Sequence, residues 1–177
     1  MSAKIMEEIS RRKVFCDGGM GSLLQAKRLK AGELPETWNV LRPEILREIH
    51  KAYLEAGCDI VTTNTFGANR LKYPAGGPFD LKEIIEAAED NARWAVSQAG
   101  RGFVALDLGP TGKLLKPLGD LDFDDACHIY REVVEAGRDR ADLILVETMS
   151  DGYEAKAAIL AAKENSSLPV FATMTFD

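Results

Sequence analysis

The feature of this sequence that most constrains its fold is a regular alternation of short apolar runs with helical patterns. Helical spacing of apolar residues is clear after Pro43 and again after Asp80. The apolar runs, rich in β-branched residues, lie at 14–17, 60–66, 103–108, 143–148 and 169–176. Continuously apolar strands that alternate with helices are typical of a parallel sheet with right-handed crossovers. The sequence therefore predicts an α/β fold with about five parallel strands and intervening helices.

Polar residues stand where the first four predicted strands end: Asp17, Asn64 with Thr65, Asp107 and Glu147. In a (βα)₈ barrel the strand ends converge on one face, where active sites lie. In an open doubly wound sheet only the ends near the switch point would be useful, so four polar ends favour the barrel. A barrel needs eight strands and roughly 250 residues. We therefore expect a partial (βα)₈ TIM barrel that is not closed within this chain.

The chain divides into an N-terminal segment, 1–12, and an incomplete barrel domain, 13–177. No linker or internal repeat interrupts the second part. The last predicted strand has no covering helix after it, so a long apolar edge would be exposed. Self-association through this open edge is one expected consequence.

Three glycines follow Asp17 within four positions, in Asp17-Gly18-Gly19-Met20-Gly21. Glycines there allow close approach of a ligand, and successive N–H groups can form a nest for a carboxylate or phosphate. Asp17 beside the nest supplies the opposite charge, so the loop complements a zwitterion such as an amino acid. The alternative is a tight strand-to-helix turn capped by Asp17.

Composition excludes several classes of function. The net charge of −6 provides no basic stripe, so no nucleic-acid partner is expected. No apolar run approaches a bilayer span, and 1–13 lacks the apolar centre of a signal peptide. Cys16, Cys58 and Cys127 are scattered, which indicates reduced thiols in a cytoplasmic protein and no closed zinc site within this chain. Gly19-x-Gly21 lacks the third glycine of a dinucleotide fingerprint.

Asp17 and Glu147 are the strongest candidates for chemistry. Two carboxylates on neighbouring strand ends could hold a substrate ammonium, each charged hydrogen bond contributing about 1.5–3 kcal/mol. The alternative for either residue is to cap the next helix. Asn64 could orient a substrate or satisfy the loop backbone, and for Asp107 a structural and a functional role remain open.

Several motifs together resemble the homocysteine S-methyltransferase family, and within it the N-terminal homocysteine-binding module of cobalamin-dependent members. They follow in the family's order and cover the chain from about Lys13: Asp17-Gly-Gly-Met-Gly-Ser-Leu-Leu-Gln, Glu36-x-Trp-Asn, Thr63-Asn-Thr-Phe-Gly-Ala-Asn-Arg, Leu108-Gly-Pro-Thr-Gly, Val146-Glu-Thr-Met-Ser-Asp and Phe171-Ala-Thr-Met-Thr-Phe-Asp.

The resemblance implies a barrel that binds homocysteine. It places the substrate-binding positions at Asp17, Gly18, Gly19, Met20, Thr63, Asn64 and Glu147. In the family a zinc ion held by three cysteines lowers the pKa of the substrate thiol, and the thiolate attacks the methyl group of methylcobalamin, giving methionine.

The family's zinc ligands match none of the three cysteines, so we expect them beyond residue 177. Cobalamin is expected on another module. The implied partners are homocysteine, the remaining barrel, and the cobalamin and folate modules of a longer protein. The chain alone is not expected to be a competent methyltransferase.

Two other functions remain open. One is a barrel lyase or aldolase that uses Asp107 and Glu147 as general acid and base. No lysine stands at a strand end, which disfavours Schiff-base chemistry. The other is a non-catalytic binding or assembly fragment. The methyl donor is also open, because betaine- and S-methylmethionine-using relatives share the barrel.

Overall fold

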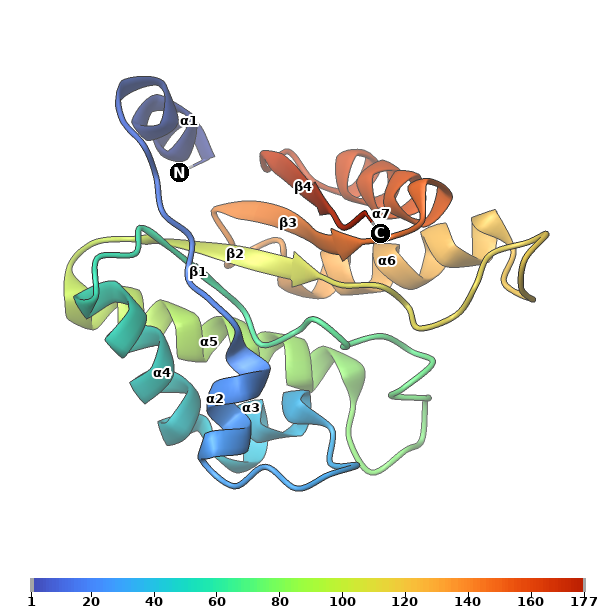
Figure 1. Cartoon of the computed structure of the whole chain (residues 1–177), viewed down its shortest axis with the longest axis horizontal. Helices are drawn as coiled ribbons and strands as arrows, with labels where there is room; N and C mark the ends of the chain where they lie inside the picture. Colours follow the sequence, from blue (N-terminus) through green and yellow to red (C-terminus); the bar gives the residue numbers. More distant parts are fainter. Residues whose placement is uncertain (1, 177) are drawn as a thin grey trace.

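The computed structural model describes residues 2–176 and contains one open parallel sheet with the strand order β1-β2-β3-β4 (Figure 1). The strands are β1 (Ile60–Thr62), β2 (Phe103–Leu108), β3 (Leu143–Met149) and β4 (Val170–Met174). The helices are α1 (Ser2–Arg11), α2 (Met20–Ala26), α3 (Trp38–Leu41), α4 (Pro43–Glu55), α5 (Leu81–Ala99), α6 (Phe123–Gly137) and α7 (Gly152–Asn165), with a 3₁₀ turn, η1, at Pro35–Thr37. Every strand pair is parallel, as the alternation predicts.

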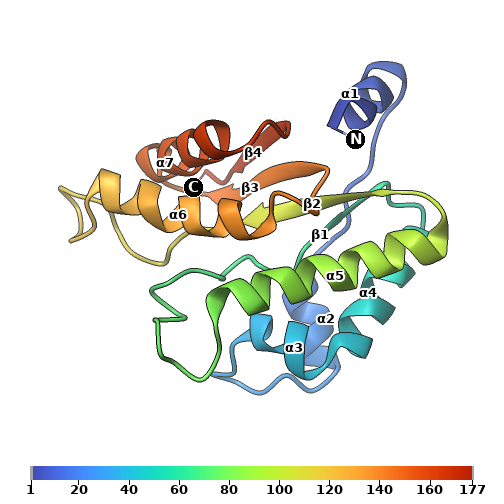
Figure 2. The ribbon, with the colours of Figure 1, turned by 180° about the vertical axis from the view of Figure 1, so that it is seen from behind.

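The two faces of the sheet bury different side chains, because successive residues of a strand point to opposite sides. Leu106, Ile144 and Val146 belong to the core packed against the helices. Ala105, Leu143 and Leu145 face the other side and form a second core with Ile5 of α1. The views from front and back show α1 apart from the other helices, on the opposite side of the sheet (Figures 1 and 2). This second face corresponds to the interior of a barrel.

The first predicted strand is much shorter than expected. It is reduced to one parallel bridge between Cys16 and Ile60, so the sheet has four strands rather than about five. The carbonyl of Phe15 accepts from the N–H groups of both Asp59 and Ile60, which departs from regular ladder pairing. The glycines after Asp17 then turn the chain away at once. The barrel is not closed, and β4 is an edge strand with exposed residues at 172–174.

The helix ends follow local chemistry in most places. Asp80 accepts a hydrogen bond from Glu83 N at 3.1 Å, and Asp151 caps α7 through Tyr153 N at 2.7 Å. Gly100 ends α5 with φ of 66°. Asp122 precedes α6 but does not cap it with its side chain, because its carboxylate pairs with a lysine instead.

The short helix α2 starts within the glycine turn, at Met20, and ends at Ala26. Among the described residues, no helix is both long and apolar enough to cross a bilayer.

Candidate functional site

Asp17 lies beside β1, at the end of the short segment that pairs with Ile60. Its N–H donates to Ile60 O at 2.9 Å. Its carboxylate accepts from Thr62 twice, from N at 2.9 Å and from Oγ1 at 3.1 Å. Burial raises the pKa of Asp17 to about 6, because loss of hydration outweighs the hydrogen bonds from Thr62 and the charge of Glu147 adds to it. The carboxylate is therefore held firmly but is short of positive charge.

Asp107 stands near the end of β2 and is only 3% exposed. Its N–H donates to Thr63 Oγ1 at 3.0 Å, while Oδ1 has no hydrogen-bond partner among residues 2–176. Burial raises its pKa well above the usual range, and repulsion from Glu147 and Asp17 raises it further. A buried acceptor without a donor is costly unless a ligand or water supplies one.

Glu147 stands near the end of β3, where the pairing with β4 shifts register between Val146 and Met149. The next residue, Thr148, has φ of 56°, which is uncommon for a β-branched side chain. The N–H of Thr148 donates to Thr173 Oγ1 at 2.8 Å. At this irregularity Glu147 is half-buried and Thr148 is exposed, whereas the other residues of β3 are buried. Burial raises the pKa of the Glu147 carboxyl group. Bulges commonly re-aim a side chain beside an active site.

These three carboxylates, which we call the acidic rim (Asp17, Asp107 and Glu147), lie at the carboxyl ends of the segment beside β1, of β2 and of β3. The charge of Glu147 raises the pKa of Asp17, and the charges of both raise that of Asp107. None of them forms an ion pair with a cationic side chain in the described part of the chain. Three acids without a cation form a site of strongly negative potential, suited to a positively charged group.

Thr63 and Asn64 lie next to the acidic rim, but their polar atoms bind other parts of the protein. Thr63 Oγ1 is 2.7 Å from Thr65 Oγ1 and accepts from Asp107 N. The Asn64 amide donates to Pro35 O at 2.9 Å and to a neighbouring asparagine side chain at 3.0 Å. Both residues therefore fix the backbone around the rim, and their contact with a substrate stays a prediction.

The glycine turn is placed beside Asp17, but its glycines do not adopt left-handed conformations: Gly18, Gly19 and Gly21 all lack positive φ. What the structure shows is close packing. A Cβ on Gly18 would lie 3.1 Å from the Tyr53 hydroxyl, and that hydroxyl donates to Gly19 O at 3.4 Å. An anion nest formed by this turn and Met20 stays a prediction.

Within residues 2–176, no group of three or more histidine, cysteine, aspartate or glutamate side chains could hold a metal ion. The three cysteines are free. Cys58 donates its thiol to Cys16 O at 3.4 Å, whereas Cys127 lies on α6. The residues present do not fit the three-cysteine zinc ion that the family resemblance implies.

Sequence reasoning left the role of Asp107 open and missed Thr62 and Thr148. The signal for Asp107 was its place at a strand end, which also identified Asp17 and Glu147. Thr62 could have been noticed in the polar run that ends the second predicted strand. No sequence signal marks Thr148, because its conformation arises from the pairing of β3 with β4.

The fold is that of an α/β barrel-type protein, and the acidic rim is a candidate site at the carboxyl ends of its strands. A family model described as homocysteine S-methyltransferase matches residues 14–177. The chain belongs to that family.

Relatives and solved structures agree with this assignment. The chain is similar to methionine synthase of Mycobacterium tuberculosis, with 32% identity over 98% of this chain and 16% of that protein. Methionine synthase of Mycobacterium leprae is 29% identical over the same shares. The structure resembles the metallated form of the homocysteine methyltransferase MmuM from Escherichia coli, with a TM-score of 0.75, 26% identity, and coverage of 96% of this chain and 65% of that one. The chain thus spans 16% of the length of these methionine synthases.

Proposed function

We propose that this chain forms the part of a homocysteine S-methyltransferase that binds the α-ammonium group of homocysteine. The observation that carries the proposal is the acidic rim, three carboxylates with raised pKa values and no cationic side chain paired with them in the described residues. A substrate ammonium offers three N–H donors and the missing positive charge. Asp17, already fixed by Thr62, and Glu147 are the direct ligands, and the buried Oδ1 of Asp107 is a further acceptor without a donor of its own in the described residues.

We expect the protonation of the acidic rim to change when the substrate ammonium binds. Without substrate, repulsion and burial favour the protonated acids, most clearly at Asp17 with its pKa of about 6. A bound ammonium favours the ionised acids, so their pKa values fall and binding releases protons near pH 6. Affinity is therefore expected to rise as the pH increases through about 6.

In our proposal the groups that carry out methyl transfer lie outside the described residues. The described residues hold no zinc site, so we assign no step of thiol activation to them. In our proposal the rim orients the amino-acid end of homocysteine. The activating metal and methylcobalamin, the donor that we favour, belong to other parts of a longer protein similar to methionine synthase.

Calorimetry can test the proposal with L-homocysteine and 4-sulfanylbutanoate, which lacks the amine. We expect binding of homocysteine to depend on the amine and to release protons, seen as a heat that varies with buffer. The change Glu147→Gln should weaken binding roughly 10- to 100-fold, the loss of one charged hydrogen bond. The matched control is Glu164→Gln, on an exposed position of α7. Equal affinity for the two compounds, or no binding of either at millimolar concentration, would overturn the proposal.

One observation favours the second candidate, a lyase or aldolase. The carboxyl groups of Asp107 and Glu147 both have raised pKa values, and the charge of Glu147 raises that of Asp107, as in acid–base pairs. Under this alternative Glu147→Gln would leave ligand affinity intact and abolish turnover. A loss of affinity for the amine-bearing ligand supports the first proposal instead.

A further inference from the structure

The segment that carries Asp17 is held to the sheet by very few ladder contacts. It makes one bridge, Cys16 with Ile60, and Asp17 N donates to Ile60 O at 2.9 Å. A slip of one residue would turn Asp17 to the other face of the sheet, because side chains alternate. Something besides the ladder has to fix the register of this segment.

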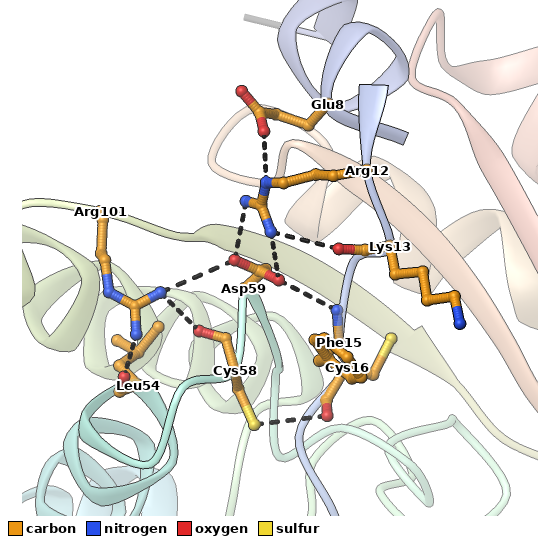
Figure 3. Close-up of polar contacts among 9 residues, drawn as sticks. All are labelled: Glu8, Arg12, Lys13, Phe15, Cys16, Leu54, Cys58, Asp59 and Arg101. Carbon is orange, nitrogen blue, oxygen red and sulfur yellow. Dashed lines mark hydrogen bonds and ion pairs between the residues drawn. The ribbon is translucent and has the colours of Figure 1, made fainter. Parts of the chain in front are cut away.

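Asp59 is the residue directly before β1. Its carboxylate accepts hydrogen bonds from Arg12 and from a backbone N–H group of the segment (Figure 3). Arg12 donates to it twice, from Nη1 to Oδ2 at 3.0 Å and from Nη2 to Oδ1 at 2.9 Å. Phe15 N donates to Asp59 Oδ2 at 3.0 Å, and Asp59 N donates to Phe15 O at 2.8 Å. The backbone N–H and the carbonyl group of Phe15, two positions before Asp17, are thus both bound to Asp59.

Further contacts hold both Arg12 and Asp59 in place. Arg12 Nε donates to Glu8 of α1 at 2.8 Å. This bond connects the ion pair of Arg12 and Asp59, which we call the clamp, to the N-terminal helix. Arg101 Nη1 lies 3.7 Å from Asp59 Oδ1 and donates to Cys58 O at 3.0 Å. The side chain of Asp59 is only 8% exposed, and the pair with Arg12 holds the pKa of that carboxyl group below its usual range.

We propose that Arg12 and Asp59 are positioning residues for Asp17: their two-pronged ion pair fixes Phe15 and thereby the register that presents the Asp17 carboxylate to Thr62 and to the acidic rim. The inference rests on the proposed role of Asp17 in binding the substrate ammonium. Neither residue touches the rim itself. The N-terminal helix therefore contributes to the site through Glu8, which binds Arg12 directly after the helix.

The test is the variant Arg12→Met of the whole chain, studied without ligand. Carbon NMR of the carboxyl groups follows the pKa of Asp17, and amide exchange follows the N–H groups of Asp17 and Thr62. When the clamp is lost, water reaches Asp17, and its pKa should fall from about 6 towards the ordinary aspartate value, because burial is the main cause of the shift. Exchange at the two amides should accelerate roughly tenfold or more, while β2 and β3 stay protected.

Two further variants keep the inference testable. Arg12→Lys retains the charge without the fork of donors and should give an intermediate shift; it also serves if Arg12→Met does not fold. Arg70→Met is the control, because Arg70 is about as exposed as Arg12 and also donates twice to one carboxylate, that of the more exposed Glu132. It should leave the pKa of Asp17 unchanged.

An unchanged pKa of Asp17 in both Arg12 variants would overturn the inference. So would equal acceleration of exchange throughout the sheet, since that would show only general destabilisation. The measurements need no substrate, so failure of homocysteine to bind would reject the proposed function and leave the clamp standing.

Discussion

Both ends of the sheet carry aspartate or glutamate side chains, but among the described residues these carboxylates have cationic partners at only one of the two ends. At the amino end, Asp59 precedes β1 and Asp142 precedes β3, and both are nearly buried. Asp59 pairs with Arg12 at 2.9 Å and Asp142 with Arg93 at 2.7 Å. Each carboxylate also accepts from a backbone N–H of the neighbouring segment. Each of these acids thus has a cationic partner and a backbone donor, and it joins one strand segment to the next.

At the carboxyl end, the acidic rim has no such arginines. Burial raises the pKa of each of its three carboxyl groups, whereas the pKa of Asp59 is lowered. The difference lies in the partner and not in the residue type. Paired acids hold the scaffold together, and unpaired acids at a strand end are candidates for binding a ligand.

The largest effect is expected where a pair is broken. The change Asp142→Ala leaves Arg93 without its carboxylate and Val104 N without its acceptor. We expect a loss of roughly 3 kcal/mol in the free energy of unfolding, the cost of breaking a largely buried pair, measured by urea denaturation. Glu147→Gln, at the other end, should cause no such loss. If the two variants were equally destabilised, the comparison between the two ends would fail.

Glu89 on α5 sharpens the comparison, because it is unpaired yet far from the rim. It is buried, neither carboxylate oxygen has a hydrogen-bond partner in residues 2–176, and burial raises its pKa to about 8. The folded state therefore keeps a proton that the unfolded state releases, and stability falls as the pH rises from about 5 to about 8. In Glu89→Gln this decline should be smaller by about 3 kcal/mol.

Urea unfolding of Glu89→Gln and of the parent chain between pH 5 and pH 9 measures this difference. Parallel stability curves would show that the carboxyl group of Glu89 is hydrated or paired in solution. Agreement with the prediction would show that a missing partner alone does not mark a ligand site. Glu89 lies in a helix packed into the core, whereas the rim stands at strand ends.

Much of the scaffold was predictable from the sequence, because local chemistry determines it. The apolar runs of β2 and β3 are buried whatever their neighbours, and their predicted bounds agree closely with the structure. Asp80 and Asp151 cap their helices through bonds to residues two or three positions away. Asp17 and Glu147 were expected on neighbouring strand ends, which is wrong, because β1 and β2 lie between the segment of Asp17 and β3. The two carboxyl groups still lie at the same edge of the sheet, where the charge of Glu147 raises the pKa of Asp17.

What could not be predicted depends on residues distant in sequence. The first strand is short because Asp59 and Ile60 both donate to one carbonyl. The Asn64 amide is occupied by Pro35 and a second asparagine, contacts that no local pattern encodes. The buried, partnerless state of Asp107 likewise follows from the packing of three strands. The sequence indicates where a residue stands along its strand, but it does not indicate which distant residues that side chain contacts across the sheet.

A smaller effect tests whether the titration of the acidic rim makes the folded state less stable as the pH rises. Asp17 has a folded-state pKa of about 6, above its unfolded value, so its contribution to stability is full below about pH 4 and is lost as the pH rises through about 6. Asp17→Asn should remove about 1–2 kcal/mol of that decline. Asp59→Asn should act in the opposite direction, because stability from a lowered pKa is lost as the pH falls. Unfolding measured from pH 3 to pH 7 separates the two, and curves of the same sign would contradict the contrast.

The smallest effect concerns backbone strain, which the structure places at the unpaired end. Thr148 is exposed and has φ of 56°, and its N–H bond to Thr173 does not depend on its side chain. Asparagine tolerates this left-handed conformation far better than a β-branched residue. Thr148→Asn should therefore stabilise the chain by about 0.5–1 kcal/mol in urea denaturation. Thr148→Val, which keeps the branch, is the control and should give no gain. A destabilised Thr148→Asn would mean that the bulge is relaxed in solution and that Glu147 is presented by some other means.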